Sequence, residues 1–176
     1  MRSILLGALL LAACKPRAES PEAAMARQAA DQKAAETALA SALDRFVVHY
    51  NSGHVDSVLT FFAPDAHLMP PNTPTIVGHA ALKTALEQAL AAKPQLKLVT
   101  EAVAASGDLA VERGTYEETV TPPGSTTAVT DRGKYLTHWH RIGGQWLIVD
   151  DMANSDLPPP GGAPPPPAPT SRRPPN

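Results

Sequence analysis

The stretch QLKLVTEAVAASGDLAVERGTYEETV, residues 95–120, decides the fold of this chain. Apolar and polar residues alternate on both sides of Ser106-Gly107-Asp108, a tripeptide typical of a tight hairpin turn. The alternation returns over 128–141 and 145–153, on either side of Gly143-Gly144. We therefore predict four strands, near 96–105, 109–121, 128–141 and 145–153, joined as an antiparallel meander.

Upstream of this stretch the apolar residues follow a helical period. A long first helix should end near residues 51–53, a short second helix should span about 55–62 and stop at Pro64, and a third should run from Gly78 to Lys93-Pro94. Residues 66–77 hold three prolines, which predict a short irregular strand pair or loop rather than central sheet. Helices followed by a meander predict an α+β domain in which the three helices cover one face of the sheet.

The first 13 residues have the pattern of a signal peptide. Arg2 supplies a positive charge, residues 4–11 form a short apolar run, and Ala12-Ala13 are small residues before a cleavage point. The run is too short to cross a bilayer as a helix.

Cys14 follows these alanines directly and is the only cysteine in the chain. Leu11-Ala12-Ala13-Cys14 resembles the lipobox of bacterial lipoproteins, which implies that the mature chain begins at a lipid-bearing Cys14 and is held on a membrane. Several acyl chains anchor a protein stably, whereas one binds only marginally. Lys15 stands where an aspartate would resemble an inner-membrane retention signal, so the outer membrane facing the periplasm is favoured over the inner membrane.

Composition divides the remaining chain into a tether, a domain and a tail. Residues 14–27 lack a repeating apolar face and should form the tether, and 28–156 should form one domain. Ten of the 19 prolines lie in residues 157–176, which predicts an extended, disordered tail. The formal net charge of -2 gives no reason to propose a nucleic-acid partner, which normally requires a basic patch, so we expect none.

Several short motifs within the domain carry a family resemblance. They are Arg45-Phe46-Val47, Asn51 to Asp56, Phe62 to Ala66, Gly78, Glu112 to Tyr116, Gly133 to Leu136, and Trp146 to Asp156. Their order is similar to that of the nuclear transport factor 2-like superfamily, and more narrowly to its SnoaL-like branch. The resemblance covers roughly residues 35–156.

This resemblance implies a cone in which a curved sheet wraps the helices around a deep, mostly apolar pocket, often in a homodimer formed through the sheet. We expect no metal and no cofactor. The residues expected to line the pocket are Phe46, Tyr50, Phe62, Met69, Glu112, Tyr116, Lys134, His138, Trp139, Asp151 and Asn154.

The same superfamily contains ketosteroid isomerase, which needs a carboxylate base and opposing proton donors. By alignment, the two donor positions hold Phe46 and Thr137, and the base position holds Pro70. A phenyl ring donates no hydrogen bond and a proline accepts no proton, so we expect no isomerase of that type.

Several candidate site residues can be interpreted in two ways. The Tyr50 hydroxyl is either a ligand contact or a surface group, and Gly114 would leave room for a ligand. A buried Glu112 would need a partner, with Lys134 or Arg132 on the adjoining strand. His138 and His140 share a strand face, but their spacing alone is weak support for a metal site.

Three functions follow from these patterns. The first is a membrane-tethered domain that binds a small, largely apolar molecule. The second is an enzyme of another chemistry, such as a cyclase, dehydratase or hydrolase, that uses Tyr50, His138 or Asp151. The third is an envelope interaction domain that uses the outer face of the sheet.

Overall fold

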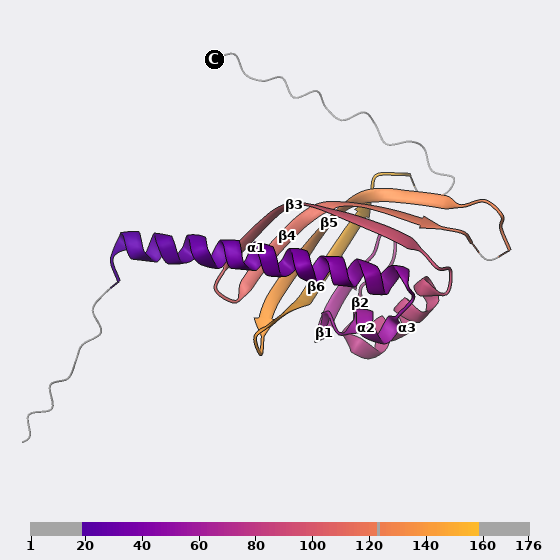
Figure 1. Ribbon diagram of the computed structural model, residues 1–176. Coiled ribbons are helices and arrows are strands. Elements are labelled where there is room, and N and C mark those ends of the chain that lie inside the picture. Colours follow the sequence, from indigo (N-terminus) through magenta and orange to yellow (C-terminus); the bar gives the residue numbers. More distant parts are fainter. Residues whose placement is uncertain (1–18, 123, 159–176) are drawn as a thin grey trace, which may run out of the picture.

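The computed structural model describes residues 19–122 and 124–158. The expected signal peptide, Cys14 and nearly all of the Pro-rich tail lie outside these residues. The described chain is one α+β domain in which three helices pack on a curved, unclosed, mainly antiparallel sheet of six strands (Figure 1). No helix within it has the length and apolar composition needed to cross a bilayer.

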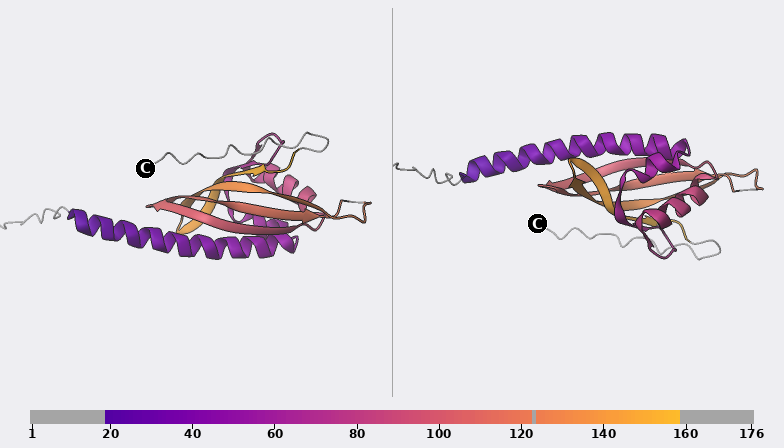
Figure 2. Two further views of the ribbon diagram at one scale, coloured as in Figure 1. Left: turned by 90° about the horizontal axis from the view of Figure 1, so that it is seen from above. Right: turned by 90° about the horizontal axis from the view of Figure 1, so that it is seen from below.

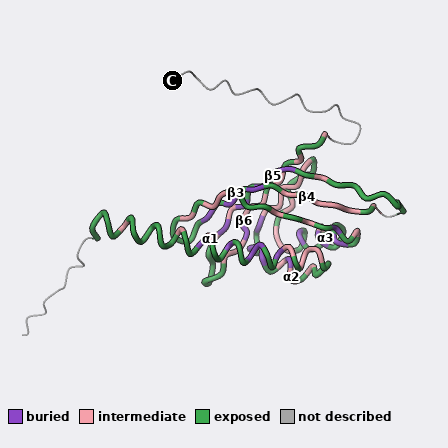
Figure 3. The backbone as a smooth tube through the Cα atoms, turned by 45° about the horizontal axis from the view of Figure 1, so that its top comes forward, coloured by how far each residue is buried: buried purple, intermediate pink, exposed green. Residues whose placement is uncertain are grey.

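Helix α1, Pro21–Asn51, is longer than the sequence pattern predicts and begins inside the segment assigned to the tether. Ser20 caps it by accepting a hydrogen bond from the Ala23 amide, 3.2 Å away, and Pro21 occupies the first turn. The following alanines favour a helix without forming an apolar stripe, which is why periodicity missed them. This first part of α1 is largely exposed (Figure 3), and the buried stripe begins at Ala35.

Two amide side chains of α1 bind the backbone of β3, Gln95–Ser106, which is an edge strand of the sheet. Gln32 donates to the Val103 carbonyl at 2.7 Å and accepts from the Ala105 amide at 2.6 Å. Asn51 makes the same pair of contacts with the carbonyl and amide of Leu96, at 3.0 and 2.7 Å. The two ends of the packed part of α1 are thus fixed along this strand.

Helix α2, Val55–Leu59, is shorter than expected, and the next strand begins earlier. Phe62 is the first residue of β1, Phe62–Met69, and not the end of the helix. Strand β1 forms the expected pair with β2, Ile76–Val77, but it lies inside the sheet between β2 and β6, so the expectation that this segment lies outside the central sheet was wrong. Pro64 is tolerated because the β1–β6 register shifts between Phe62 and His67.

The rest of the domain follows the predicted order. Helix α3, Gly78–Leu90, buries Leu82, Leu86 and Leu90. Strands β4, Leu109–Val120, β5, Val129–Ile142, and β6, Gln145–Ser155, complete the meander. The strand order is β2-β1-β6-β5-β4-β3, and the β1–β6 pairing is parallel.

The helices lie on one side of the curved sheet, as the two further views show (Figure 2). The sheet therefore has an inner face toward the helices and an outer face away from them. Side chains alternate between these faces along each strand. On β5 the inner set is the odd-numbered one, which includes the buried Gly133, Tyr135, Thr137 and Trp139.

Candidate functional site

A cavity of about 600 Å³ lies between the inner face of the sheet and the helices. Helices α1 and α3, strand β1 with the residues that follow it, and β3 to β6 all contribute to its wall. Most of that wall is apolar or aromatic. Its polar groups come mainly from Tyr50, Tyr116, Glu118, Asp131 and Asp151.

Six of the eleven residues predicted from the sequence line this cavity: Phe46, Tyr50, Phe62, Tyr116, Trp139 and Asp151. Phe46 and Tyr50 lie one turn apart on α1 and their rings stack, with centroids 5.8 Å apart. Phe62 packs edge-on against Phe46. Aromatic rings from α1, β1, β4 and β5 therefore form much of the apolar wall.

Four of the other five predicted residues lie on the outer face, so their assignment to the pocket was wrong. Lys134 and His138 are even-numbered residues of β5, next to inward-facing neighbours. Lys134 donates to Asp156, and His138 contacts Asp150. Met69 and Asn154 occupy the outward parity of their strands, where Met69 is in register with Met152. Because consecutive residues of a strand point to opposite faces, these four side chains cannot reach the cavity on the inner face.

Glu112 points inward, as predicted, but lies behind the cavity wall in a closed network. It is 1% exposed. Its carboxylate accepts hydrogen bonds from Thr100 Oγ1 at 2.6 Å, Tyr135 Oη at 2.9 Å and Trp139 Nε1 at 3.1 Å. The predicted partners Lys134 and Arg132 are wrong because both project from the outer face of β5.

Gly114 makes room for Tyr135 and not for a ligand. A Cβ at Gly114 would overlap the Val99 carbonyl and lie 2.7 Å from the Tyr135 ring. Gly133 has the same role on β5, where a Cβ would overlap the Asn154 backbone and approach Tyr116. Both glycines allow the curved strands and the inner tyrosines to pack closely.

Asp151 is the titratable group best placed for chemistry. It lines the cavity, and its Oδ1 accepts a hydrogen bond from Thr137 Oγ1 at 2.9 Å. Burial, with a smaller contribution from the charge of Glu112, raises the pKa of Asp151 to about 6. The carboxyl group can therefore give or take a proton near neutral pH.

Two more carboxylates face the cavity: Glu118, which alternation along its strand places on the same side as Glu112 and Tyr116, and Asp131, which sequence reasoning missed as a site residue. Glu118 accepts a hydrogen bond from Tyr50 Oη at 2.8 Å, and Asp131 accepts one from Tyr116 Oη at 2.7 Å. Ser155 also donates to Asp131, at 2.5 Å. Burial is the main cause that raises the pKa of both tyrosines, which keeps their phenols protonated as donors. Counting parity from Trp139 along β5 would have indicated Asp131.

The three positions that carry the acid and base in ketosteroid isomerase by alignment also lie at this cavity. Phe46, Pro70 and Thr137 all line it. Of these, Thr137 can donate a hydrogen bond, but it donates to Asp151. The carboxyl group of this cavity is thus on β6 and not at the aligned base position.

Three histidines gather on the outer face of the sheet. His67 and His138 each contact one carboxylate oxygen of Asp150, through Nδ1, at 3.0 and 2.9 Å. The ring of His140 lies against that of His138, with centroids 4.7 Å apart. Within the described part of the chain, no group of three or more His, Cys, Asp or Glu residues is arranged to hold a metal ion.

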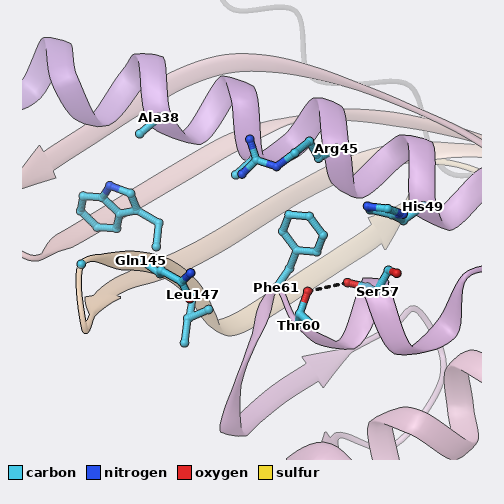
Figure 4. A pocket seen from close by; sticks show the side chains of 11 residues that line it. Ala38, Arg45, His49, Ser57, Thr60, Phe61, Gln145 and Leu147 are labelled. Atoms are coloured by element: carbon cyan, nitrogen blue, oxygen red, sulfur yellow. Dashed lines mark hydrogen bonds between the residues drawn. The ribbon is translucent and has the colours of Figure 1, made fainter.

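A second cavity of about 490 Å³, lined by Phe61, lies between α1, the α2–β1 connection and the β5–β6 turn (Figure 4). Arg45 and His49 project toward it from α1, and Gln145 borders it from the turn. Thr60 Oγ1 donates to the Ser57 carbonyl at 2.7 Å. This cavity holds none of the acid groups described above.

Comparison with known proteins identifies the domain. The family model of the SnoaL-like domain matches residues 43–149. A ketosteroid isomerase-like protein from Erwinia carotovora atroseptica SCRI1043 is 18% identical and superimposes with a TM-score of 0.62, covering 69% of this chain and 96% of that one. No curated protein matches this chain.

Two further solved structures share the fold. An NTF2-like protein with a cystatin-like fold from Novosphingobium aromaticivorans is 19% identical, with a TM-score of 0.59 over 75% of this chain and 86% of that one. A protein of unknown function from Mycobacterium tuberculosis is 17% identical, with a TM-score of 0.63 over 73% and 76%. With its family model spanning most of the domain and its helices and sheet arranged as in these structures, the chain belongs to the SnoaL-like domain family of the NTF2-like fold.

Proposed function

We propose that this protein binds a small, largely apolar molecule in the cavity inside the sheet, while lipid on Cys14 holds it at a membrane. The observation that carries the proposal is the cavity itself. Its volume of about 600 Å³ lies in the range of small-molecule sites, which are mostly apolar with a few placed polar groups. The phenols of Tyr50 and Tyr116 and the carboxyl of Asp151 are such groups.

The membrane anchor is supported by the leader sequence and by the start of α1. Pro21 follows Cys14 by seven positions, and the part of α1 that precedes the Gln32 contact with β3, residues 21–31, would span about 16 Å. A lipid-bearing Cys14 would thus be joined to the domain by a short segment and a helical spacer. The outer membrane is the proposed location because Lys15 follows the cysteine.

Mass spectrometry of the protein from its own host tests the anchor. We expect a mature chain that begins at an acylated Cys14 and sediments with membranes, and a Cys14→Ser variant released into the soluble fraction. An unmodified sulfur at position 14 would contradict the anchor and leave the cavity proposal standing.

Ligand binding is tested by a thermal-shift screen of the full mature chain against small apolar molecules. A hit should stabilise the wild type and lose its effect in Ala153→Phe, whose new ring would enter the cavity. Ala104→Phe adds the same ring at an exposed position of β3 and should bind as the wild type does. A hit that stabilises both variants equally would not bind in this cavity, and a screen without hits would count against the proposal.

A second candidate function is acid–base catalysis by Asp151 in the same cavity, favoured by its pKa of about 6. The reaction would be a cyclisation, dehydration or hydrolysis. Asp151→Asn should lower the turnover of a substrate by about 10²-fold or more while folding is kept. His138 is unsuited to this role because it contacts Asp150 on the outer face. Unchanged turnover in Asp151→Asn would exclude this chemistry.

The outer face supports association between copies of the chain, or with another envelope protein. It exposes Val99, Val111, Leu136 and Met152. Light scattering after size-exclusion chromatography should give a dimer mass for the wild type and a monomer mass for Leu136→Lys. A monomeric wild type would contradict the homodimer.

A further inference from the structure

The cavity wall carries an unbalanced charge. Glu118, Asp131 and Asp151 face the cavity, whereas none of the described residues that line it is Lys, Arg or His. The remainder of the wall is mostly apolar. A wall of this kind disfavours an anionic ligand and favours a cation.

Two of these carboxylates face each other directly. Glu118 on β4 and Asp131 on β5 are partners in the antiparallel register, on the inner face of the sheet. Like charges directly opposite each other on one sheet face are destabilising. Their hydrogen-bond donors are the neutral hydroxyls of Tyr50, Tyr116 and Ser155, which leave the charge uncompensated.

On the outer face of the sheet, by contrast, carboxylates form ion pairs with basic side chains. Glu117, next to Glu118, forms an ion pair with Lys97 at 3.1 Å. Glu101 pairs with Arg113, and Asp156 pairs with Lys134. Within residues 19–122 and 124–158, no ion pair involves Glu118 or Asp131. Among the described residues of the cavity wall, no basic side chain balances these two carboxylates. A bound ligand would therefore supply the positive charge.

The aromatic rings of the cavity add to this preference. Phe46, Tyr50 and Tyr116 all line the cavity. The hydroxyls of Tyr50 and Tyr116 donate hydrogen bonds to the carboxylates of Glu118 and Asp131. The face of an aromatic ring attracts an ammonium group, most strongly where water is excluded. An apolar body would occupy the space toward Phe62 and Trp139.

We infer that the ligand of this cavity is an organic cation, a protonated amine on an apolar body, whose ammonium group lies between Glu118 and Asp131. The inference depends on the proposed ligand-binding function and specifies the class of its ligand. An ammonium group has three donors for carboxylate oxygens. A metal ion fits less well because Ca²⁺ takes six to eight oxygen ligands, and the described residues offer no cluster of three metal-binding side chains.

Three rigid probes of one shape test the charge preference. Adamantan-1-amine, adamantan-1-ol and adamantane-1-carboxylate share one apolar cage and differ in the charge of the head group. Titration calorimetry on the full mature chain at pH 7 should show that the amine binds at least about tenfold more tightly than the alcohol, with no binding of the carboxylate.

Substitution of the two carboxylates tests whether the ammonium group binds between them. In the double variant Glu118→Gln, Asp131→Asn, the side chains keep their shape and can still accept the tyrosine hydrogen bonds. Amine affinity should fall about tenfold or more, to that of the alcohol. Glu117→Gln removes one carboxylate from the outer side of the same strand and should leave amine affinity unchanged.

The outcomes separate this inference from the proposed function. Equal binding of amine and alcohol to the wild type, or a loss in Glu117→Gln as large as in the double variant, would overturn the amine preference and leave the apolar cavity in place. No binding of any probe would count against both. Displacement of the amine by Ca²⁺ or Mg²⁺ alone at low concentration would replace the organic cation with a metal site.

Discussion

Two inward-facing carboxyl groups, Glu112 on β4 and Asp151 on β6, show how the two parts of the interior differ. Glu112 is enclosed and accepts hydrogen bonds from three side chains. Asp151 borders the cavity and accepts one side-chain hydrogen bond, from Thr137. A buried acid whose oxygens are saturated by donors stabilises the fold, whereas one that faces open space remains able to exchange a proton or meet a ligand.

The largest expected effect comes from removing the saturated acid. Glu112→Ala leaves Thr100, Tyr135 and Trp139 without their acceptor inside the domain, which should lower the free energy of unfolding by about 3–5 kcal/mol. Urea denaturation monitored by tryptophan fluorescence measures this loss. The matched control is Glu101→Ala, which breaks an exposed ion pair and should cost about 1 kcal/mol or less. Similar losses in the two variants would contradict the contrast between enclosed and open acids.

Asp151 should instead make stability depend on pH. Its pKa rises from the ordinary value of 3.8 to about 6 in the folded protein, so between these values the folded state binds more protons than the unfolded state. The free energy of unfolding should therefore fall as pH rises from about 4 to about 6, by up to about 3 kcal/mol, and stay low above that. Asp151→Asn removes this contribution, so its stability relative to the wild type should improve between pH 4 and pH 7. A constant difference between the two proteins across that range would refute the raised pKa.

Gly114 tests how tightly the enclosed part is packed. Gly114→Ala places a methyl group against Tyr135 and the Val99 carbonyl, so the free energy of unfolding should fall by about 1–3 kcal/mol. Thr115→Ala alters the neighbouring, exposed position and should change stability by about 0.5 kcal/mol or less. Thermal and urea unfolding of both variants gives the comparison. If Gly114→Ala proved neutral, the close packing around the Glu112 network would be wrong.

The smallest effect is expected on the outer face. Hydrogen bonds from His138, with a further contribution from His67, lower the pKa of Asp150 below its ordinary range. A lowered pKa gives stability that is present above pH 4 and is lost as pH falls through the folded pKa. Because Asp150 is 37% exposed, Asp150→Asn should cost about 1 kcal/mol or less at pH 6, and the cost should vanish near pH 2. A cost that persists at pH 2 would point to packing rather than charge.

Much of the fold could be predicted because the spacing of the apolar residues and the positions of the turn-forming residues indicate the same element boundaries. The four meander strands, the end of α1 at Asn51 and the start of α3 at Gly78 were all predicted to within a few residues. The sequence pattern indicated no start for α1, and the helix extends into the segment assigned to the tether because an alanine-rich helix needs no apolar stripe. The start of β1 was wrong because Pro64 suggested the end of a helix, whereas the register shift beside it lets the strand continue.

The site was predicted less well than the fold, and strand parity explains most of the errors. Lys134 and His138 were assigned to the same face as Trp139, although consecutive residues of one strand point to opposite faces and both lie an odd number of positions from Trp139. On β6, Val149 lies where the register with β5 shifts between His138 and Trp139, so counting by twos from Ile148 leads to the outward-facing Asn154 and not to Asp151. Lining residues beyond such an irregularity follow from the three-dimensional register and not from periodicity.

The contacts of Gln32 and Asn51 with β3 also bear on solubility. A free edge strand is a template to which another chain can add, and at this edge two amide side chains already occupy backbone groups near both ends. The opposite edge, β2, is only two residues long and offers little backbone for pairing. Both borders of the sheet are thus protected against polymerisation, which suits a protein that, if lipid-anchored, would be concentrated in the plane of a membrane.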